Sequence, residues 1–256
     1  MIQSESCYNF FEYHNSKDTG LDNGIKTQMY KVFLPIMFNF VILYTLLNIF
    51  MGENEEKKVA EKPLKIMVAS TVLNSQDIVE QVCSTLSGYG YHVMNSHIKT
   101  IPANPRISNL QNCLNAVEAS DLVFGIITPR YGAVIAGDLS ITHQEMRRSI
   151  ELEKPRWFVS HRDIYVAREL LKQYMYLPGS ASQAANPDFI FIRTGVLDDI
   201  RLVHQYNDVI RNEIETDKRT GHWVDEYYRL PDILRVVETQ FKDVDRVRAI
   251  VEAMKQ

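Results

Sequence analysis

Nine residues in this sequence are candidates for ligand chemistry, eight through their side chains and one glycine through its backbone, and most of them directly follow an apolar segment. Hydroxyl and guanidinium groups can bind phosphate or carboxylate, and a carboxylate can stabilise an oxocarbenium-like centre or act as a nucleophile on a glycosidic bond. The candidates are Ser70, Thr71, Ser96, His97, Thr128, Arg130, Tyr131 and Gly132 for ligand binding and Glu145 for catalysis.

Each binding candidate also has an ordinary structural interpretation. Ser70 and Thr71 can offer hydroxyls and helix-terminal N–H groups to a phosphate, or they can end a strand and cap the next helix. Arg130 can clamp an anion with two parallel hydrogen bonds, or it can be a common loop arginine. Tyr131 can stack on a base, or it can lie half-buried beneath its own loop.

Glu145 can have either a catalytic role or a helix-capping role. As a carboxylate at the rim of a sheet it can take part in cleavage of a glycosidic bond. As the third residue after Thr142 it completes a capping box, and this spacing alone accounts for its presence. The histidines His97 and His143 can transfer protons, although a single loop histidine is usually a surface residue.

The elements that must position these residues alternate between strands and helices. The apolar segments 64–69, 91–96, 121–128 and 156–159 are typical of buried strands, and amphipathic helices separate them. This alternation predicts parallel strands with right-handed crossovers. We therefore expect an α/β fold, with a doubly wound, mainly parallel, flavodoxin-like sheet in the order 2-1-3-4 and helices on both faces. Ligands of such sheets bind at the carboxyl ends of the strands, where the candidates lie.

The α/β domain is expected to span residues 64–160, and residues 161–256 are expected to form an α/β-to-helical extension. Within the extension, residues 187–193, which include the sequence DFIFIR, resemble another strand. The expected helices are 164–174, 198–211, one that opens at Pro231, and one that includes Val244 to Met254.

The first 51 residues form a separate amino-terminal extension. Residues 32–51 are twenty residues without a charge, long enough for one transmembrane helix. Lysines are slightly more frequent after this run, which favours a cytoplasmic domain anchored by one amino-terminal helix. Residues 52–63 read as a polar linker. Alternatively, Met51 is the true start of the protein and residues 1–50 are not part of it.

Composition and motifs exclude several classes of function. The chain has 256 residues, 45% of them hydrophobic, and a net charge of −4 with no dense basic stretch, so nucleic acid is not an expected partner. The three cysteines have no metal-site or disulfide spacing, which favours a reducing compartment. The motifs of P-loop ATPases, Rossmann dehydrogenases, zincins and α/β-hydrolases are absent. We expect no metal and no cofactor.

Three stretches resemble the family named domain of unknown function 4062: MVASTVLNSQDIVEQV, LQNCLNAVEASDLVFGIITPRYG and SITHQEMRRSIELEKPRWFV. The resemblance covers residues 65–159 and continues more weakly through FIRTGVLDDIRLVHQYNDVI and GHWVDEYY. The family is similar to TIR-like and nucleoside deoxyribosyltransferase-like domains of bacterial defence and signalling proteins. In those relatives a glutamate at the position of Glu145 cleaves N-glycosidic bonds. Ala69 stands where the family usually has a serine.

Three functions follow from the residues and the resemblance together. The first is a signalling or defence module that binds a nucleotide-like ligand as sensor or adaptor, tethered to a membrane by residues 32–51 and acting with other proteins of its system. The second is an enzyme that hydrolyses NAD, nucleosides or nucleotides, with Glu145 catalytic and Ser70, Thr71 and Arg130 holding phosphate. The third is a protein-interaction domain without catalysis. The sequence does not predict the oligomeric state.

Overall fold

The computed structural model describes residues 43, 62–135, 139–177, 185–219 and 222–255. The chain divides into two compact units, Met1–Glu61 and Lys62–Gln256, and the fold given below is that of the second. Except for Leu43, the candidate membrane segment 32–51 lies outside the described residues. Among the described residues, no helix combines the length and apolar character needed to span a bilayer.

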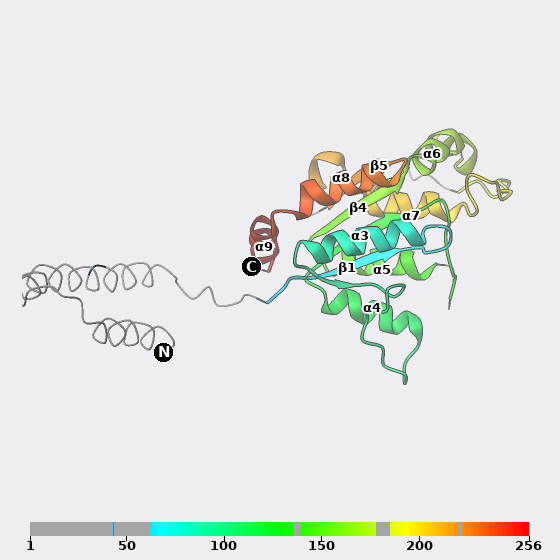
Figure 1. The fold of residues 1–256 in the computed structure, drawn as a ribbon. Helices are drawn as coiled ribbons and strands as arrows, with labels where there is room; N and C mark the ends of the chain where they lie inside the picture. Colours follow the sequence, from blue (N-terminus) through cyan, green and yellow to red (C-terminus); the bar gives the residue numbers. More distant parts are fainter. Residues whose placement is uncertain (1–42, 44–61, 136–138, 178–184, 220–221, 256) are drawn as a thin grey trace, which may run out of the picture. The chain divides into compact units, whose positions relative to one another are not determined.

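A five-stranded parallel sheet forms the centre of the second unit (Figure 1). Its strand order is β2-β1-β3-β4-β5. Side chains of β1, β3 and β4 are buried almost throughout, because helices cover both faces of the sheet. The strands are β1 (Lys65–Ser70), β2 (His92–Met94), β3 (Leu122–Ile127), β4 (Arg156–His161) and β5 (His222–Tyr227).

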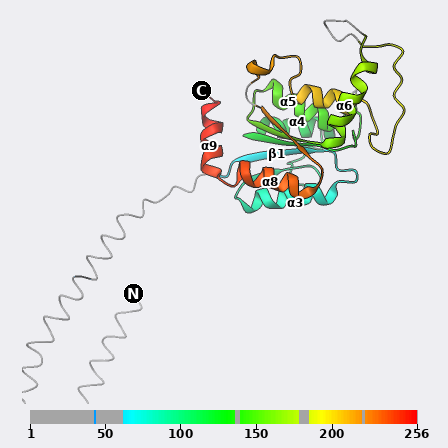
Figure 2. The same cartoon turned by 90° about the horizontal axis from the view of Figure 1, so that it is seen from above.

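Helices pack on the two faces in the doubly wound manner, as Figure 2 shows from above. On one face, α3 (Gln76–Gly88), α8 (Leu230–Phe241) and α9 (Val244–Ala253) enclose the larger apolar core. There Phe241 lies between three rings, with its centroid 5.1 Å from that of Trp157 and 5.4 Å from that of Phe124. The opposite face carries α4 (Asn109–Ala119), α5 (Ile141–Glu151), α6 (Arg162–Met175) and α7 (Arg201–Val209).

The observed topology confirms the predicted fold class and the order 2-1-3-4, and adds β5 beyond β4. This fifth strand comes from the segment that we expected to form a C-terminal extension. The strand predicted at 187–193 is wrong, because these residues pair with no strand of the sheet. Phe189 and Phe191 pack on the core while Ile190 and Ile192 are 82% and 79% exposed, so the segment alternates like a strand without joining the sheet.

Candidate functional site

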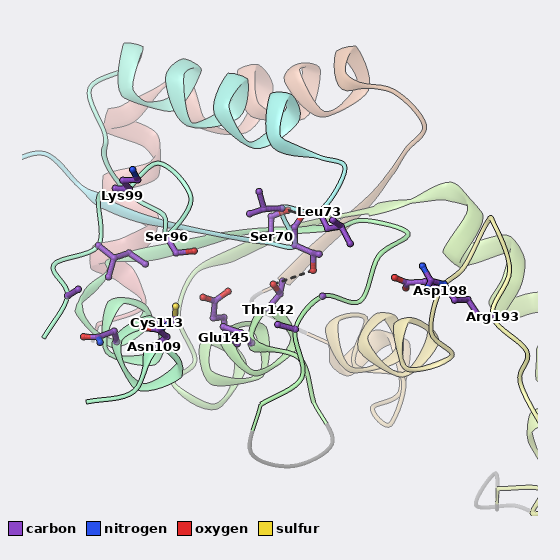
Figure 3. Close-up of a pocket in the computed structure, with 18 residues that line it drawn as sticks. Ser70, Leu73, Ser96, Lys99, Asn109, Cys113, Thr142, Glu145, Arg193 and Asp198 are labelled. Atoms are coloured by element: carbon purple, nitrogen blue, oxygen red, sulfur yellow. Dashed lines mark hydrogen bonds between the residues drawn. The ribbon is translucent and has the colours of Figure 1, made fainter. Parts of the chain in front are cut away.

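A pocket of about 970 Å³ lies at the carboxyl edge of the sheet. It is bounded by the loops after β1, β2 and β3, by the first turns of α4 and α5, and by the segment before α7. Figure 3 shows the side chains around it. The lining residues are Ser70, Thr71, Val72, Leu73, Ser96, Lys99, Ile101, Ala103, Asn109, Asn112, Cys113, Gly132, Ala133, Ile141, Thr142, Glu145, Arg193 and Asp198.

Glu145 reaches this pocket from the second turn of α5, although its side chain is almost fully buried. The helix begins earlier than the sequence predicted, because Ser140 is the N-cap and its hydroxyl accepts a hydrogen bond from the His143 N–H at 3.2 Å. Thr142 is therefore not the N-cap, and a capping box between Thr142 and Glu145 is wrong. Capping the helix does not explain the carboxyl group of Glu145.

Burial raises the pKa of Glu145 to about 8, and a hydrogen bond from the Cys113 thiol partly opposes this shift. The pKa of Cys113 is in turn raised to about 12, first by burial and then by the neighbouring Glu145 charge. Near neutral pH the glutamate is therefore largely protonated, and the thiol stays neutral. A protonated carboxyl group of this kind can donate a hydrogen bond or a proton to a ligand.

The hydroxyl groups of Ser70 and Thr71, at the end of β1, form hydrogen bonds with neighbouring loop and helix α5 residues and do not cap helix α3. Ser70 donates to the Thr71 carbonyl at 3.2 Å, and Thr71 donates to the Tyr131 carbonyl at 3.3 Å. The hydroxyl of Thr71 also lies 3.4 Å from that of Thr142. The N-cap of α3 is Ser75, so the interpretation of Ser70 and Thr71 as helix caps is wrong. Both side chains line the pocket.

The loop after β3 forms another wall of the pocket and depends on a close approach at Gly132. This glycine has a φ of +86°, and a Cβ atom there would lie 2.9 Å from Oγ1 of Thr71. An L side chain at this position would be strained in its backbone and would press on the loop after β1. Gly132 therefore allows the two loops to meet.

Tyr131 lies behind this wall and is buried. Its backbone N–H donates to Oδ1 of Asp198 at 3.0 Å, and its hydroxyl lies 2.8 Å from Nδ1 of His143. The other ring nitrogen of His143 is 2.9 Å from Oδ2 of Asp208. The guanidinium carbon of Arg201 is 4.8 Å from the centre of the tyrosine ring. These contacts anchor the loop to α5 and α7.

The structure brings five of the nine candidates to one pocket: Ser70, Thr71, Ser96, Gly132 and Glu145. The other four lie outside its lining. His97 has Nε2 2.8 Å from a Glu80 oxygen, and Thr128 exchanges hydrogen bonds with the backbone of Arg130. The Arg130 guanidinium donates to the carbonyls of Pro129 and Gly195 at 3.1 and 3.2 Å.

The sequence did not predict several polar residues of the pocket as site residues, which are Lys99, Asn109, Asn112, Cys113, Thr142, Arg193 and Asp198. Cys113 belongs to the apolar stripe of α4, so its spacing indicated only a core position. Arg193 and Asp198 come from an irregular segment that the sequence alone does not place near the sheet. Within the described ranges, no group of three His, Cys, Asp or Glu side chains could hold a metal ion.

Comparison with known proteins places the chain in a family. The family described as a domain of unknown function, DUF4062, matches residues 65–240, which is more than half of the chain and includes all five strands. The curated proteins include no match to the chain.

Proposed function

Because this chain belongs to the domain of unknown function 4062 family and carries a large pocket at its sheet edge, we propose that it binds a nucleotide-like ligand there. In this role it acts as a sensor or adaptor of a signalling or defence system. Other proteins of that system are its partners.

The buried carboxyl group of Glu145 is the observation that carries this proposal. Placing a carboxyl group in a protein interior is unfavourable, and a site that only supported the fold would have no need of it. A role in ligand binding accounts for this unfavourable burial, because Glu145 lines the pocket and a protonated carboxyl group can bind a heterocyclic nitrogen or a sugar hydroxyl. The pocket volume is also in the range of about 300–1,000 Å³ that small-molecule sites occupy.

The test is a thermal-shift experiment on the full chain with NAD, nucleoside 5′-monophosphates and nucleosides. A ligand that binds only the folded state stabilises it by RT ln(1 + [L]/Kd), so the melting temperature rises with the logarithm of ligand concentration once the site is nearly saturated. We expect a rise that weakens in Glu145→Met, which removes the hydrogen-bond donor, and persists in Glu252→Gln, a control on the exposed face of α9. If no compound raises the melting temperature, the third function, a protein-interaction domain, replaces this proposal.

The protonation of Glu145 favours one second candidate, hydrolysis of an N-glycosidic bond. A carboxyl group with a pKa of about 8 can donate its proton to the departing base at neutral pH as the bond from the sugar carbon to the base nitrogen breaks and water adds to that carbon. The proton that the water loses then restores the carboxyl group of Glu145. The test is chromatography of NAD and nucleosides after incubation with the full chain. Free base that appears with the natural protein and Glu252→Gln, but not with Glu145→Gln, supports catalysis.

The apolar segment 32–51 supplies the membrane tether in this proposal. Its twenty uncharged residues are the observation that supports it. We expect the full chain to stay in the membrane fraction after alkaline carbonate extraction, and a chain without residues 32–51 to be released. Release of the full chain would contradict the tether and leave the ligand proposal intact.

A further inference from the structure

The loop after β2 is fixed in one shape by the side chain of Asn95, which is buried. Its Nδ2 donates to the Val68 carbonyl at 2.8 Å, and its Oδ1 accepts from the N–H groups of His97 at 2.9 Å and Ile98 at 3.3 Å. The backbone N–H of Asn95 donates to Oγ1 of Thr100 at 2.9 Å. The loop is therefore anchored to β1 at one end and closed on itself at the other.

This anchored loop contributes Ser96 and Lys99 to the pocket. Lys99 has a φ of 59°, a left-handed conformation that is uncommon for a residue with a side chain. Such a conformation is strained for a residue with a side chain and persists because its surroundings impose it. The strain and the Asn95 hydrogen bonds together hold a lysine at the pocket wall.

The charge of Lys99 is available to a ligand. The residue of this loop that contacts a carboxylate is His97, whose Nε2 lies 2.8 Å from an oxygen of Glu80. In the part of the chain that the structure describes, no carboxylate forms an ion pair with Lys99.

Charges in the pocket are unevenly distributed, as Figure 3 shows. Lys99 and Ser96 lie at one end and Arg193 lies beside Asp198 at the other, with Glu145 between the two ends. The Arg193 end therefore holds a carboxylate as well as a cation, and Oδ1 of Asp198 accepts a hydrogen bond from the Tyr131 N–H. The Lys99 end carries a cation, hydroxyl and amide groups, and the first turn of α4, whose partial positive charge also favours an anion.

We propose that Lys99 and Ser96 bind the phosphate group of a nucleotide, so that the pocket selects nucleoside phosphates over nucleosides. This inference rests on the proposed function and adds the ligand class and its orientation. The phosphate lies at the end of the pocket formed by the loop after β2, and the sugar and base extend toward Glu145.

The experiment compares each of the four common nucleoside 5′-monophosphates with its matching nucleoside by calorimetric titration of the full chain. We expect at least one monophosphate to bind about tenfold or more tightly than its nucleoside, which corresponds to about 1.4 kcal/mol. In Lys99→Met this difference should fall to less than about threefold, with the affinity for the nucleoside unchanged. Lys218→Met, which changes an exposed lysine of the 3-10 turn Thr216–Lys218, should leave both affinities as they are.

Two further variants separate charge from loop shape. Lys99→Gly accepts the left-handed conformation without strain and removes the charge, so it should lose the preference for phosphate as Lys99→Met does. Lys99→Arg keeps the charge and should keep the preference.

Equal affinity of the natural protein for nucleosides and monophosphates would overturn the phosphate site while leaving the proposed function standing. A phosphate preference that survives in both Lys99→Met and Lys99→Gly would overturn it as well. Binding of neither class would overturn both proposals.

Discussion

The hydroxyl of Tyr131 lies 2.8 Å from Nδ1 of His143, and this contact joins the pocket wall to the interior of α5. His143 is buried and its second nitrogen faces Asp208 at 2.9 Å, so both ring nitrogens are engaged. Arg147 also approaches Asp208, with Nε 3.8 Å from the same oxygen. A buried imidazole that is hydrogen-bonded on both sides has one preferred ring orientation, and through Tyr131 it fixes the loop that carries Gly132.

Replacing Tyr131 by phenylalanine should therefore destabilise the fold. The change removes the hydroxyl and leaves a buried imidazole nitrogen unpaired, which costs about 1–3 kcal/mol. Urea unfolding measures the difference. Tyr228→Phe is the matched control because Tyr228 is 62% exposed, and equal unfolding free energies of the two variants would contradict the role of the contact.

The close approach at Gly132 predicts a difference between two glycine substitutions. Gly90 has a φ of +96° with no atom within 4 Å of an added Cβ, so Gly90→Ala measures backbone strain alone, about 1–2 kcal/mol. Gly132→Ala adds the contact with Thr71 and should cost at least about 1 kcal/mol more, because the packed wall must shift. Thermal unfolding of both variants tests this. A smaller loss for Gly132→Ala would show that the two loops do not press on each other.

The raised pKa of Glu145 makes stability depend on pH in a defined direction. Between pH 4.5, its ordinary pKa, and about 8, the folded protein keeps a proton that the unfolded chain releases, so stability falls as the pH rises. Above about pH 8 the loss is complete. The side chain of Glu145→Gln does not titrate. As the pH rises across this window, the free energy of unfolding of the variant should therefore increase relative to that of the natural protein, by at most about 1.4 kcal/mol per pH unit. Unfolding free energies at pH 5, 6.5 and 8 measure it, and a constant difference would contradict burial of an ionisable carboxyl group.

Two arginines at the amino end of β4 predict a stabilising substitution. Arg156 is 4% exposed and its Nε has no hydrogen-bond partner among the described residues. Burial, and after it repulsion by the charge of Arg211, lower the pKa of Arg156 to about 10, while the charge of Glu153 opposes this shift. Arg211→Gln removes this repulsion and should stabilise the protein by about 0.5–1 kcal/mol at low ionic strength, with a smaller gain in salt.

The weak ion pair of Arg211 with Glu213, at 3.7 Å, offsets little of this gain. Arg235→Gln, on an arginine whose side chain is 75% exposed, should change stability by less. Denaturant unfolding at two salt concentrations compares the variants. Loss of stability in Arg211→Gln at both concentrations would contradict the repulsion.

The sequence predicted the sheet where each strand is an uninterrupted apolar run, as in β1 and β3. It missed β5 because Trp223, Asp225 and Glu226 give that strand a mixed composition, and its pairing with β4 depends on residues far apart in the chain. At 187–193 the phenylalanines and isoleucines do alternate between two sides of the chain. The phenylalanines pack on the core and the isoleucines are exposed, but the segment pairs with no strand of the sheet.

The sequence could predict those residues of the candidate site that lie at the carboxyl ends of strands. Ser70 ends β1, and Ser96 and Gly132 lie in the loops after β2 and β3, so all three meet at one edge of the sheet. The distinction between Arg130 and Arg193 was not predictable, because it depends on which guanidinium a loop turns inward. The sequence also could not identify Ser140 as the N-cap of α5, because Thr142 is a similarly favourable capping residue by type.

The late position of β5 has a consequence for synthesis of the protein. Residues 162–221 separate β4 from β5, so a ribosome must complete most of the chain before the outer edge of β4 is covered. Until α8 also emerges, the rings that surround Phe241 in the finished domain are exposed to the solvent. A nascent chain of this kind offers open backbone and apolar surface together, which is the combination that chaperones bind and that favours aggregation.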